Sequence, residues 1–323
     1  MRGSVAIGLF LGSGLGACHG APSQHSLAID ASTPSASASD TRSANRRLVA
    51  PRTPGGAACR AIAVDGDVRV AASGSDSDGG ETRLAAEDTV GDGAWLSLAK
   101  AARLVLKDPQ SLRETMFLGP GRARGCVSRR NESWLGAGRF EGSLGGGEMP
   151  SAEEWVITPL GVLRYVSAKV DVDATPDATT AAIAGGTCFF WSADDTRAEV
   201  QPASPDGGAV DTNDPPWRRV AGGVVRIVPA ALTPPLLTAR SAIDRCSERA
   251  SHAEQLARIL LARDAGAIPS GQTVAEQVRA RRIAHASCAV AAVRLDLLAP
   301  SSARDSLAGV LAQADQAWSS LPR

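Results

Sequence analysis

Between Cys59 and about Pro229, short apolar runs alternate with glycine, proline and aspartate. The segment Arg103-Leu104-Val105-Leu106-Lys107 is one example, with an apolar centre between two basic residues. Short runs of this kind, bounded by turn-forming residues, are typical of β-strands. The pattern therefore predicts an all-β domain over residues 59–229.

Three segments within this domain carry more specific expectations. Ala61–Val64 and Val68–Val70 flank Asp65-Gly66-Asp67, a sequence that is typical of a β-hairpin turn. Residues 162–172 are β-branched and alternating, and they predict a strand. Residues 201–216 are polar and rich in proline and aspartate, so we expect an exposed loop or the end of the domain.

Glycines cluster at positions 136, 138, 142 and 145–147. No Lys-Ser/Thr pair follows them and they do not open a helix, so they do not match a phosphate-binding loop. Their spacing instead predicts tight packing between strands.

From about Leu236 the apolar period becomes 3.6 residues, which is typical of helices. Asp264-Ala265-Gly266 ends the first predicted helix, and Thr273 with Glu276 forms a capping box that opens a second. Pro300 ends the second helix, and a third, shorter one follows. The predicted fold is therefore α+β, with the all-β domain followed by a helical hairpin in a C-terminal region over residues 230–323.

Two cysteines lie at matched positions in this hairpin, whose turn centres near residue 268. Cys246 lies 22 residues before that point and Cys288 lies 20 after it, so the two should face each other across antiparallel helices. We predict a disulfide between them. Cys59 with Cys126 is a second possible pair, which would leave Cys188 unpaired. The absence of a Cys-x-x-Cys motif argues against a thioredoxin-like site or a zinc ribbon.

The chain opens with MRGSVAIGLFLGSGLGACHG, which combines one basic residue, an apolar stretch and a cysteine. Val5–Leu15 is too short to cross a hydrocarbon core of about 30 Å. Leu15-Gly16-Ala17-Cys18 resembles a bacterial lipobox, which implies a signal peptide over residues 1–17 and a lipid on Cys18. The alternative is an ordinary secretory signal with a chance cysteine.

Residues 18–58 are rich in serine, alanine and proline and contain few large apolar side chains. Such a segment cannot bury enough surface to fold, so we expect a tether. No later stretch reaches 18 consecutive apolar residues. The expectation is a protein held to a membrane by lipid, on the periplasmic or surface side of the cell envelope, with the outer membrane as the expected location.

Several segments between residues 59 and 190 resemble the FecR domain, an all-β periplasmic module of bacterial envelope signalling and cell-surface proteins. AIAVDGDVRV is similar to its opening strand pair, LAAEDTVGDGAWLSLAKAARLVLKD to the section that follows, LRETMFLGPG to the next strand and turn, and EEWVITPLGVLRYVSAKVDV to a later strand pair. Ser167-Ala168 replaces the usual Gly-Thr, and Asp88 replaces a usual glycine. The resemblance implies a solenoid-like or sandwich-like module that works by contact and not by catalysis.

The family's sigma regulators also carry a cytoplasmic helical segment and a transmembrane helix. This sequence shows no candidate for either, so we do not expect anti-sigma activity.

Charge and histidine placement limit the chemistry that the chain can perform. Lysine plus arginine number 34, as do aspartate plus glutamate, and this balance argues against a dedicated nucleic-acid binder. The predicted β-domain contains no histidine, which argues against a Ser/His/Asp or Cys/His triad there. We therefore expect no catalytic residues, no metal site and no cofactor.

Two groups of residues are candidates for contact with a partner. Trp134 and Trp155, together with Trp217, are aromatic candidates for an exposed surface, although core packing is the alternative for each. A basic cluster could meet envelope anions or form a solvated face. It consists of Arg122, Arg124, Arg129 and Arg130.

The first hypothesis is a lipid-anchored, non-enzymatic envelope protein that binds, senses or scaffolds an envelope protein or peptidoglycan. The second is a secreted glycan hydrolase that uses carboxylates. It would need a shared cleft for two of Glu132, Glu148, Glu153 and Glu154. The third is a structural lipoprotein whose hairpin mediates assembly, which would need a large exposed apolar stripe on that hairpin.

Overall fold

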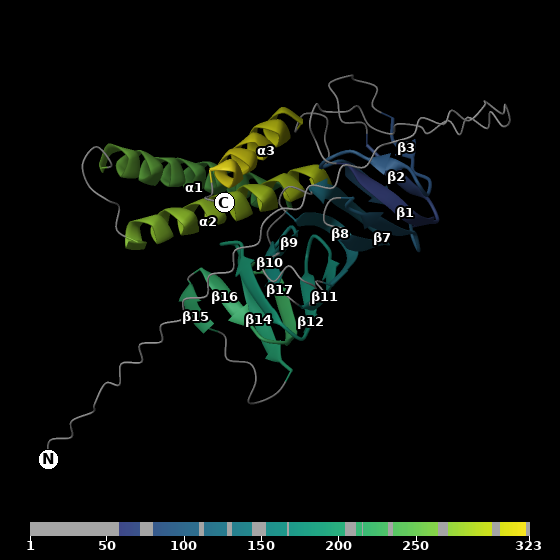
Figure 1. The fold of residues 1–323 in the computed structure, drawn as a ribbon, viewed down its shortest axis with the longest axis horizontal. Helices are drawn as coiled ribbons and strands as arrows, with labels where there is room; N and C mark the ends of the chain where they lie inside the picture. Colours follow the sequence, from purple (N-terminus) through teal and green to yellow (C-terminus); the bar gives the residue numbers. More distant parts are fainter. Residues whose placement is uncertain are drawn as a thin grey trace, which may run out of the picture. The chain divides into compact units, whose positions relative to one another are not determined.

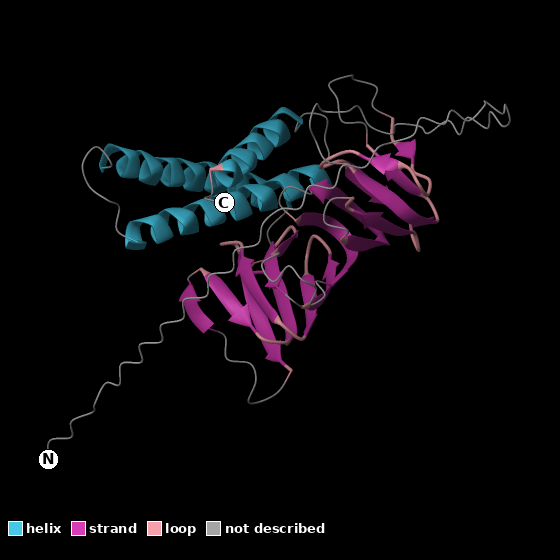
Figure 2. Ribbon diagram, viewed as in Figure 1, coloured by secondary structure: helices cyan, strands magenta, loops and turns pink. Residues whose placement is uncertain are grey.

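The computed structural model describes residues 58–71, 80–109, 113–127, 131–143, 153–166, 168–203, 211–214, 216–231, 235–263, 271–298 and 304–320. The lipobox with Cys18 and nearly all of the predicted tether lie outside these residues. Strands occupy the described chain up to Pro229, and three helices follow (Figures 1 and 2). The prediction of an α+β fold, with a β-rich part before a helical part, is confirmed.

The strands are β1 (Cys59–Asp65), β2 (Val68–Val70), β3 (Thr82–Arg83), β4 (Thr89–Val90), β5 (Trp95–Leu98), β6 (Arg103–Lys107), β7 (Glu114–Val127), β8 (Glu132–Ser143), β9 (Glu154–Ile157), β10 (Gly161–Val166), β11 (Lys169–Ala174), β12 (Thr179–Ala184), β13 (Thr187–Ser192), β14 (Thr196–Pro202), β15 (Asp211–Asp214), β16 (Trp217–Val220) and β17 (Gly223–Pro229). The helices are α1 (Pro235–Arg263), α2 (Gly271–Leu298) and α3 (Arg304–Ser319).

The 17 strands of the described residues are all joined by hydrogen bonds, and their pairing forms two layers. The first, which we call the outer layer, runs β4-β1-β6-β7-β8-β11-β12-β17-β14. The second, the inner layer, runs β3-β2-β5-β7-β8-β9-β10-β13-β16-β15. The long strands β7 and β8 belong to both, so each must bend from one layer into the other.

Glycines allow that bend. Thr115–Leu118 of β7 pairs with β6, whereas Gly121–Arg124 pairs with β5. A Cβ atom on Gly121 would lie 2.1 Å from the carbonyl oxygen of Ala137, and Gly138 has φ +104°, a conformation that side chains disfavour. Tight strand packing, predicted for the glycine cluster, is confirmed at Gly138 and Gly142, where an added Cβ atom would lie within 3 Å of atoms of β7 and β10. Glycines 145–147 lie outside the described residues.

The predicted hairpin at Asp65-Gly66-Asp67 is wrong. β1 pairs with β4 and β6 in the outer layer, whereas β2 pairs with β3 and β5 in the inner layer. The turn therefore carries the chain from one layer to the other. Residues 162–172 are likewise not one strand, because β10 and β11 lie in different layers. Residues 211–214 of the predicted loop form β15.

Apolar side chains fill two cores, one on each face of the inner layer. Leu163 and Phe190 point into the core between the layers, whereas Val162 and Trp191 point into the core beneath the helices. Both faces of β9 and β10 are therefore buried, so these strands do not alternate between buried and exposed residues.

The helices pack on the inner layer, with α2 at their centre. Every residue of α2 from Ala284 to Asp296 is buried, so this part of the helix has no solvent-facing side. The 3.6-residue apolar period of the sequence predicted that only one face of this helix would be buried. The difference arises because α1, α3 and the strands β8, β9 and β10 all contact α2. None of the helices described is long and apolar enough to span a membrane.

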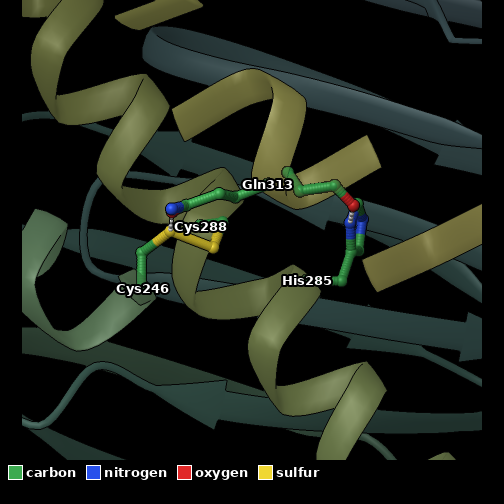
Figure 3. Close-up of a disulfide and its surroundings, with 5 residues drawn as sticks. Cys246, His285, Cys288 and Gln313 are labelled. Atoms are coloured by element: carbon green, nitrogen blue, oxygen red, sulfur yellow. Dashed lines mark hydrogen bonds between the residues drawn. A yellow bond between two sulfur atoms is a disulfide. The ribbon is translucent and has the colours of Figure 1, made fainter. Parts of the chain in front are cut away.

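The predicted disulfide between Cys246 and Cys288 is present, and it joins α1 to α2 (Figure 3). The side chain of Gln313 on α3 contacts Cys246 Sγ. All three helices therefore meet at this bond.

Candidate functional site

The core beneath the helices contains all six tryptophans of the chain. Trp134, Trp155, Trp191 and Trp217 come from strands of the inner layer and are buried, and Trp95 and Trp318 are partly buried against them. Polar contacts cross the same junction at three places. This junction between the inner layer and the helices is therefore where the largest side chains and the buried charges gather.

The first crossing joins β8 to α2 through Glu132 and His285, which are both fully buried. His285 Nε2 lies 2.5 Å from Glu132 Oε1, and His285 Nδ1 lies 3.0 Å from the carbonyl oxygen of Ala314 on α3. Because a carbonyl can only accept, Nδ1 carries a proton, and a further proton must lie between Nε2 and Oε1. The Trp134 indole donates to the other carboxylate oxygen of Glu132 at 2.9 Å.

Aromatic rings close this pair off from solvent. The centroids of Trp155 and Trp318 lie 5.6 and 4.8 Å from that of His285. A buried pair with this many partners holds the helices on the sheet.

The second crossing joins β7 to the end of α2. Arg122 Nε and Nη2 donate to the two carboxylate oxygens of Asp296, at 2.8 and 3.1 Å. Arg122 Nη1 also donates to Ser97 Oγ and Glu81. The arginine is therefore bound on both sides by this chain's own residues.

The third crossing joins α2 to the loop between β13 and β14. Arg294 is buried; its Nη1 and Nη2 donate to both oxygens of Asp195 at 2.7 and 2.9 Å, and its Nε donates to the carbonyl oxygen of Pro159 at 2.6 Å. This bidentate geometry fixes the position of α2 relative to the strands.

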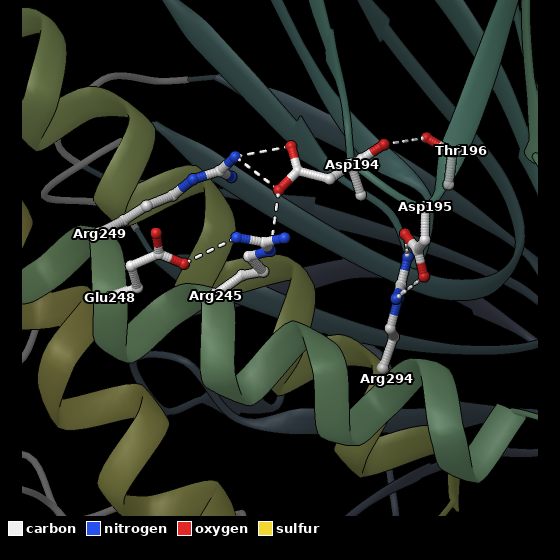
Figure 4. A network of polar contacts seen from close by, with 8 residues as sticks. Asp194, Asp195, Thr196, Arg245, Glu248, Arg249 and Arg294 are labelled. Carbon is white, nitrogen blue, oxygen red and sulfur yellow. Dashed lines mark hydrogen bonds and ion pairs between the residues drawn. The ribbon is translucent and has the colours of Figure 1, made fainter.

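Beside this pair, two arginines of α1 converge on Asp194 (Figure 4). Arg249 Nη2 lies 2.7 and 2.8 Å from the two oxygens of Asp194, and Arg245 Nε lies 3.5 Å away. The Arg249 guanidinium also lies 5.2 Å from the centroid of the Trp191 ring. Arg245 and Arg249 are one helical turn apart, so both reach the same carboxylate.

These residues surround a cavity of about 180 Å³, which we call the arginine cavity. We call its buried apolar residues Trp191, Ala193 and Val290 the floor, and its partly exposed charged residues Asp194, Arg245 and Arg249 the rim. Its lining consists of Trp191, Ala193, Asp194, Asp195, Ser241, Ala242, Arg245, Arg249, Ser287, Val290 and Arg294. Three guanidinium groups face two carboxylates in this lining.

A second cavity, of about 230 Å³, is a neighbour of the first, because Asp195 and Arg294 line both. The rest of its lining is mostly apolar. It consists of Pro159, Leu160, Pro176, Asp177, Thr196, Pro229, Leu297 and Leu298. The helix–sheet junction thus has a cavity with a charged lining and a more apolar one, which share the Asp195–Arg294 ion pair.

The tryptophans proposed as exposed contact residues are not exposed. Trp134, Trp155 and Trp217 have 0%, 1% and 1% of their surface accessible. They lie on strands of the inner layer, whose outer face the helices cover. The alternative from the sequence, core packing, holds for all three.

The described arginines of the basic cluster proposed for partner binding contact other residues of this chain. Arg122 binds Asp296, and Arg124 Nε donates to the carbonyl oxygen of Gly93 at 2.7 Å, with its guanidinium 4.5 Å from the Trp134 ring centroid. Arg129 and Arg130 lie outside the described residues.

The carboxylates proposed for a hydrolase have separate internal partners. Glu153 pairs with Arg164 at 2.9 Å, and Glu154 pairs with Arg113 at 2.6 Å. Burial raises the pKa of Glu154, and the charge of Arg113 opposes that rise. Of the three candidate glutamates that the structure describes, Glu132 lines a small cavity beside Cys59 and Cys126, and Glu153 and Glu154 are not in its lining. Glu148 lies outside the described residues. These acids give the hydrolase hypothesis no shared cleft.

Sequence reasoning missed the arginine cavity. The sequence did indicate that Arg245 and Arg249 share one face of a helix, because they lie one turn apart in a predicted helix. Nothing in the sequence links that turn to Asp194, which lies 55 residues from Arg249.

Among the described residues, no group of three or more histidine, cysteine, aspartate or glutamate side chains is arranged to hold a metal ion. Exposed large apolar side chains in the described part are Ile259 and Val274, on the helical hairpin. Two side chains do not make the stripe that an assembly surface would need.

In comparisons with protein-family models, with curated proteins and with solved structures, nothing matches this chain. The resemblance to the FecR domain and the lipobox therefore remain predictions.

Proposed function

We propose that this chain is a lipid-anchored, non-enzymatic binding protein of the cell envelope, and that the arginine cavity is its ligand site. The observation that carries this proposal is the cavity itself, with a buried apolar floor and a partly exposed charged rim. Concave sites with an apolar lining and a few convergent polar groups are the usual form of ligand sites.

The rim is suited to a ligand that carries a carboxylate. Asp194 has 43% of its side chain exposed, so its pairing with Arg249 is made largely in water and is weak. A ligand carboxylate can replace Asp194 on the guanidinium of Arg249, where Nη2 now meets both oxygens of Asp194. Arg245, which is also exposed, can then bind the same ligand carboxylate.

The floor is suited to the uncharged part of such a ligand. Trp191, Ala193 and Val290 are buried and apolar, and Ser241 and Ser287 add hydroxyl groups. A compact molecule with carboxylate, amide and hydroxyl groups fits this chemistry. Peptidoglycan fragments, which combine amino sugars with peptide carboxylates, are the envelope ligand that we propose.

Titration calorimetry with a soluble muropeptide would test the site, and an N-acetylglucosamine oligomer without carboxylates is the ligand control. We expect binding of the muropeptide alone. Arg249→Gln should weaken it at least tenfold, and Ser241→Trp should block it by filling the cavity. Arg258→Gln is the matched control, because Arg258 lies on the same helix but pairs with Glu254 away from the cavity.

Equal affinity in wild type, Arg249→Gln and Ser241→Trp would place the ligand elsewhere on the chain. If no muropeptide binds, crosslinking from the same positions can test whether the cavity binds a protein. A photo-reactive amino acid at Ser241 should then capture one envelope protein in intact cells, whereas one at Arg258 should not.

The anchor needs a separate test, because Cys18 lies outside the described residues. Growth with a labelled fatty acid should label the wild-type protein, and Cys18→Ala should abolish the label. An unlabelled wild-type protein would favour the ordinary secretory signal.

A further inference from the structure

Three cysteines of the β-layers are free and buried, and two of them lie together. Cys59 is the first residue of β1, and Cys126 lies near the end of β7. Cys59 is close enough to the Cys126 thiol to contribute, after burial, to the raised pKa of that thiol. Both residues also line one small cavity, which they share with Asp108, Arg113 and Glu132.

The fold explains how residues so far apart in sequence meet. β1 begins in the outer layer beside β4 and β6, whereas the second half of β7 has bent into the inner layer beside β5. Cys59 and Cys126 therefore approach each other from the two layers. Cys126 adopts φ +61°, a conformation that is uncommon for a residue with a side chain. Both thiols are part of the core between the two layers.

We propose that Cys59 and Cys126 are the site of a second disulfide, which forms when the protein meets a disulfide-bearing oxidant. Thiol–disulfide exchange with such an oxidant, for which oxidised glutathione serves as the probe, proceeds in two steps. One protein thiolate attacks the oxidant and releases one reduced glutathione. The second protein thiolate then attacks the mixed disulfide and releases the other. The two protein thiols lose two protons and two electrons, and the oxidant is reduced to two thiols.

Burial makes this reaction slow at neutral pH. It raises the pKa of Cys126 well above its usual value, and the thiolate is the attacking species. We therefore expect the rate of bond formation to increase as the pH is raised from 7 to 9. In cells, an oxidoreductase or an opening of the strand end at Cys59 would be needed.

The bond would secure the start of β1. Cys59 begins the first strand, and Cys126 lies next to Val127, which pairs with Glu132 of β8. Glu132 in turn binds His285 of α2. A disulfide here therefore connects the start of the β-layers to the strand that holds the helices, as Cys246–Cys288 connects the helices to one another.

The sequence allows a direct test by peptide mass mapping of the full chain. Trypsin releases Cys59 in TPGGAACR (residues 53–60) and Cys126 in GCVSR (residues 125–129). It releases the known pair in CSER (residues 246–249) and IAHASCAVAAVR (residues 283–294), which serves as the internal control. The protein is incubated with oxidised glutathione at pH 8.5, blocked with N-ethylmaleimide under denaturing conditions and digested without reductant.

We expect the linked peptide TPGGAACR–GCVSR to become the dominant form of both peptides. Cys126→Ser should abolish it, and Cys188→Ser, the matched loss of the third buried thiol, should leave it unchanged. Recovery of both peptides in the blocked, reduced form after prolonged incubation would overturn the proposal. So would a link from either peptide to the Cys188 peptide. This outcome is independent of muropeptide binding, so each proposal can fail alone.

Discussion

His285 Nε2 lies 2.5 Å from Glu132 Oε1, and neither side chain reaches solvent. The two residues are 153 positions apart in the chain. One lies on the central helix and the other begins the strand that spans both β-layers. This contact is therefore a direct polar link between the helices and the sheet.

Removal of either partner should destabilise the protein strongly. Glu132→Ala or His285→Ala leaves a buried polar group without its partner, and each should cost about 3–5 kcal/mol of unfolding free energy. The double variant should cost less than the sum of the two. Glu132→Gln should cost less than Glu132→Ala, because its amide can donate to Nε2 while its oxygen accepts from Trp134. Chemical denaturation of the four variants measures these differences, and additive single effects would contradict a direct link.

A side chain at Gly136 should push α2 away from the sheet. A Cβ atom there would lie 3.0 Å from Leu297 Cδ2 on the helix, so Gly136→Val should destabilise the protein by about 1–3 kcal/mol through overpacking. Gly309→Ala on α3 is the control, because a Cβ atom there meets no other atom within 4 Å. It should stabilise the protein by about 0.4–1 kcal/mol. Thermal unfolding would show opposite shifts, and two shifts of the same sign would argue against the close approach.

Loss of the Cys246–Cys288 disulfide should lower stability chiefly through the unfolded chain. The two cysteines are 42 residues apart, and closing a loop of that length contributes about 3–4 kcal/mol in the chain-entropy model. The double variant Cys246→Ser, Cys288→Ser should therefore unfold at lower denaturant concentration. Its midpoint should not respond to added reductant, whereas that of the wild type should fall towards it. A wild-type midpoint that reductant leaves unchanged would contradict a stabilising disulfide.

Protonation of Glu154 should add to the unfolding free energy of the protein in mild acid. Burial raises the pKa of this carboxyl in the fold, so the folded state holds the proton more tightly than the unfolded state does. Its contribution is fully present below the unfolded pKa of about 4.3 and decreases as the pH rises towards the folded pKa. Glu154→Gln cannot lose this proton.

Comparison of the wild type with Glu154→Gln isolates the contribution of this carboxyl proton to stability. The unfolding free energy of wild type minus that of Glu154→Gln should decrease between pH 4.5 and pH 7, measured by urea denaturation. A difference that increases over this range would show that Arg113 outweighs burial.

The order of elements could be predicted because it depends on local pattern. Glycine, proline and aspartate mark strand ends, and a 3.6-residue period marks the helices, so both are visible in short windows. Even the Cys246–Cys288 disulfide needed only the rise per residue of two antiparallel helices. The partners of the strands were not visible in this way. Asp65-Gly66-Asp67 has the sequence of a hairpin turn, yet β1 and β2 leave it for different layers.

The sequence by itself determined a β-rich region followed by helices, with a disulfide that braces the helical hairpin. Only the tertiary structure decided that the helices cover the inner layer. That packing buries Trp134 and Trp155, pairs Arg122 with Asp296, and places Arg249 beside Asp194. The physical reason is that exposure and ion pairing depend on contacts between distant segments. A tryptophan or an arginine looks the same in sequence whether a helix covers it or water does.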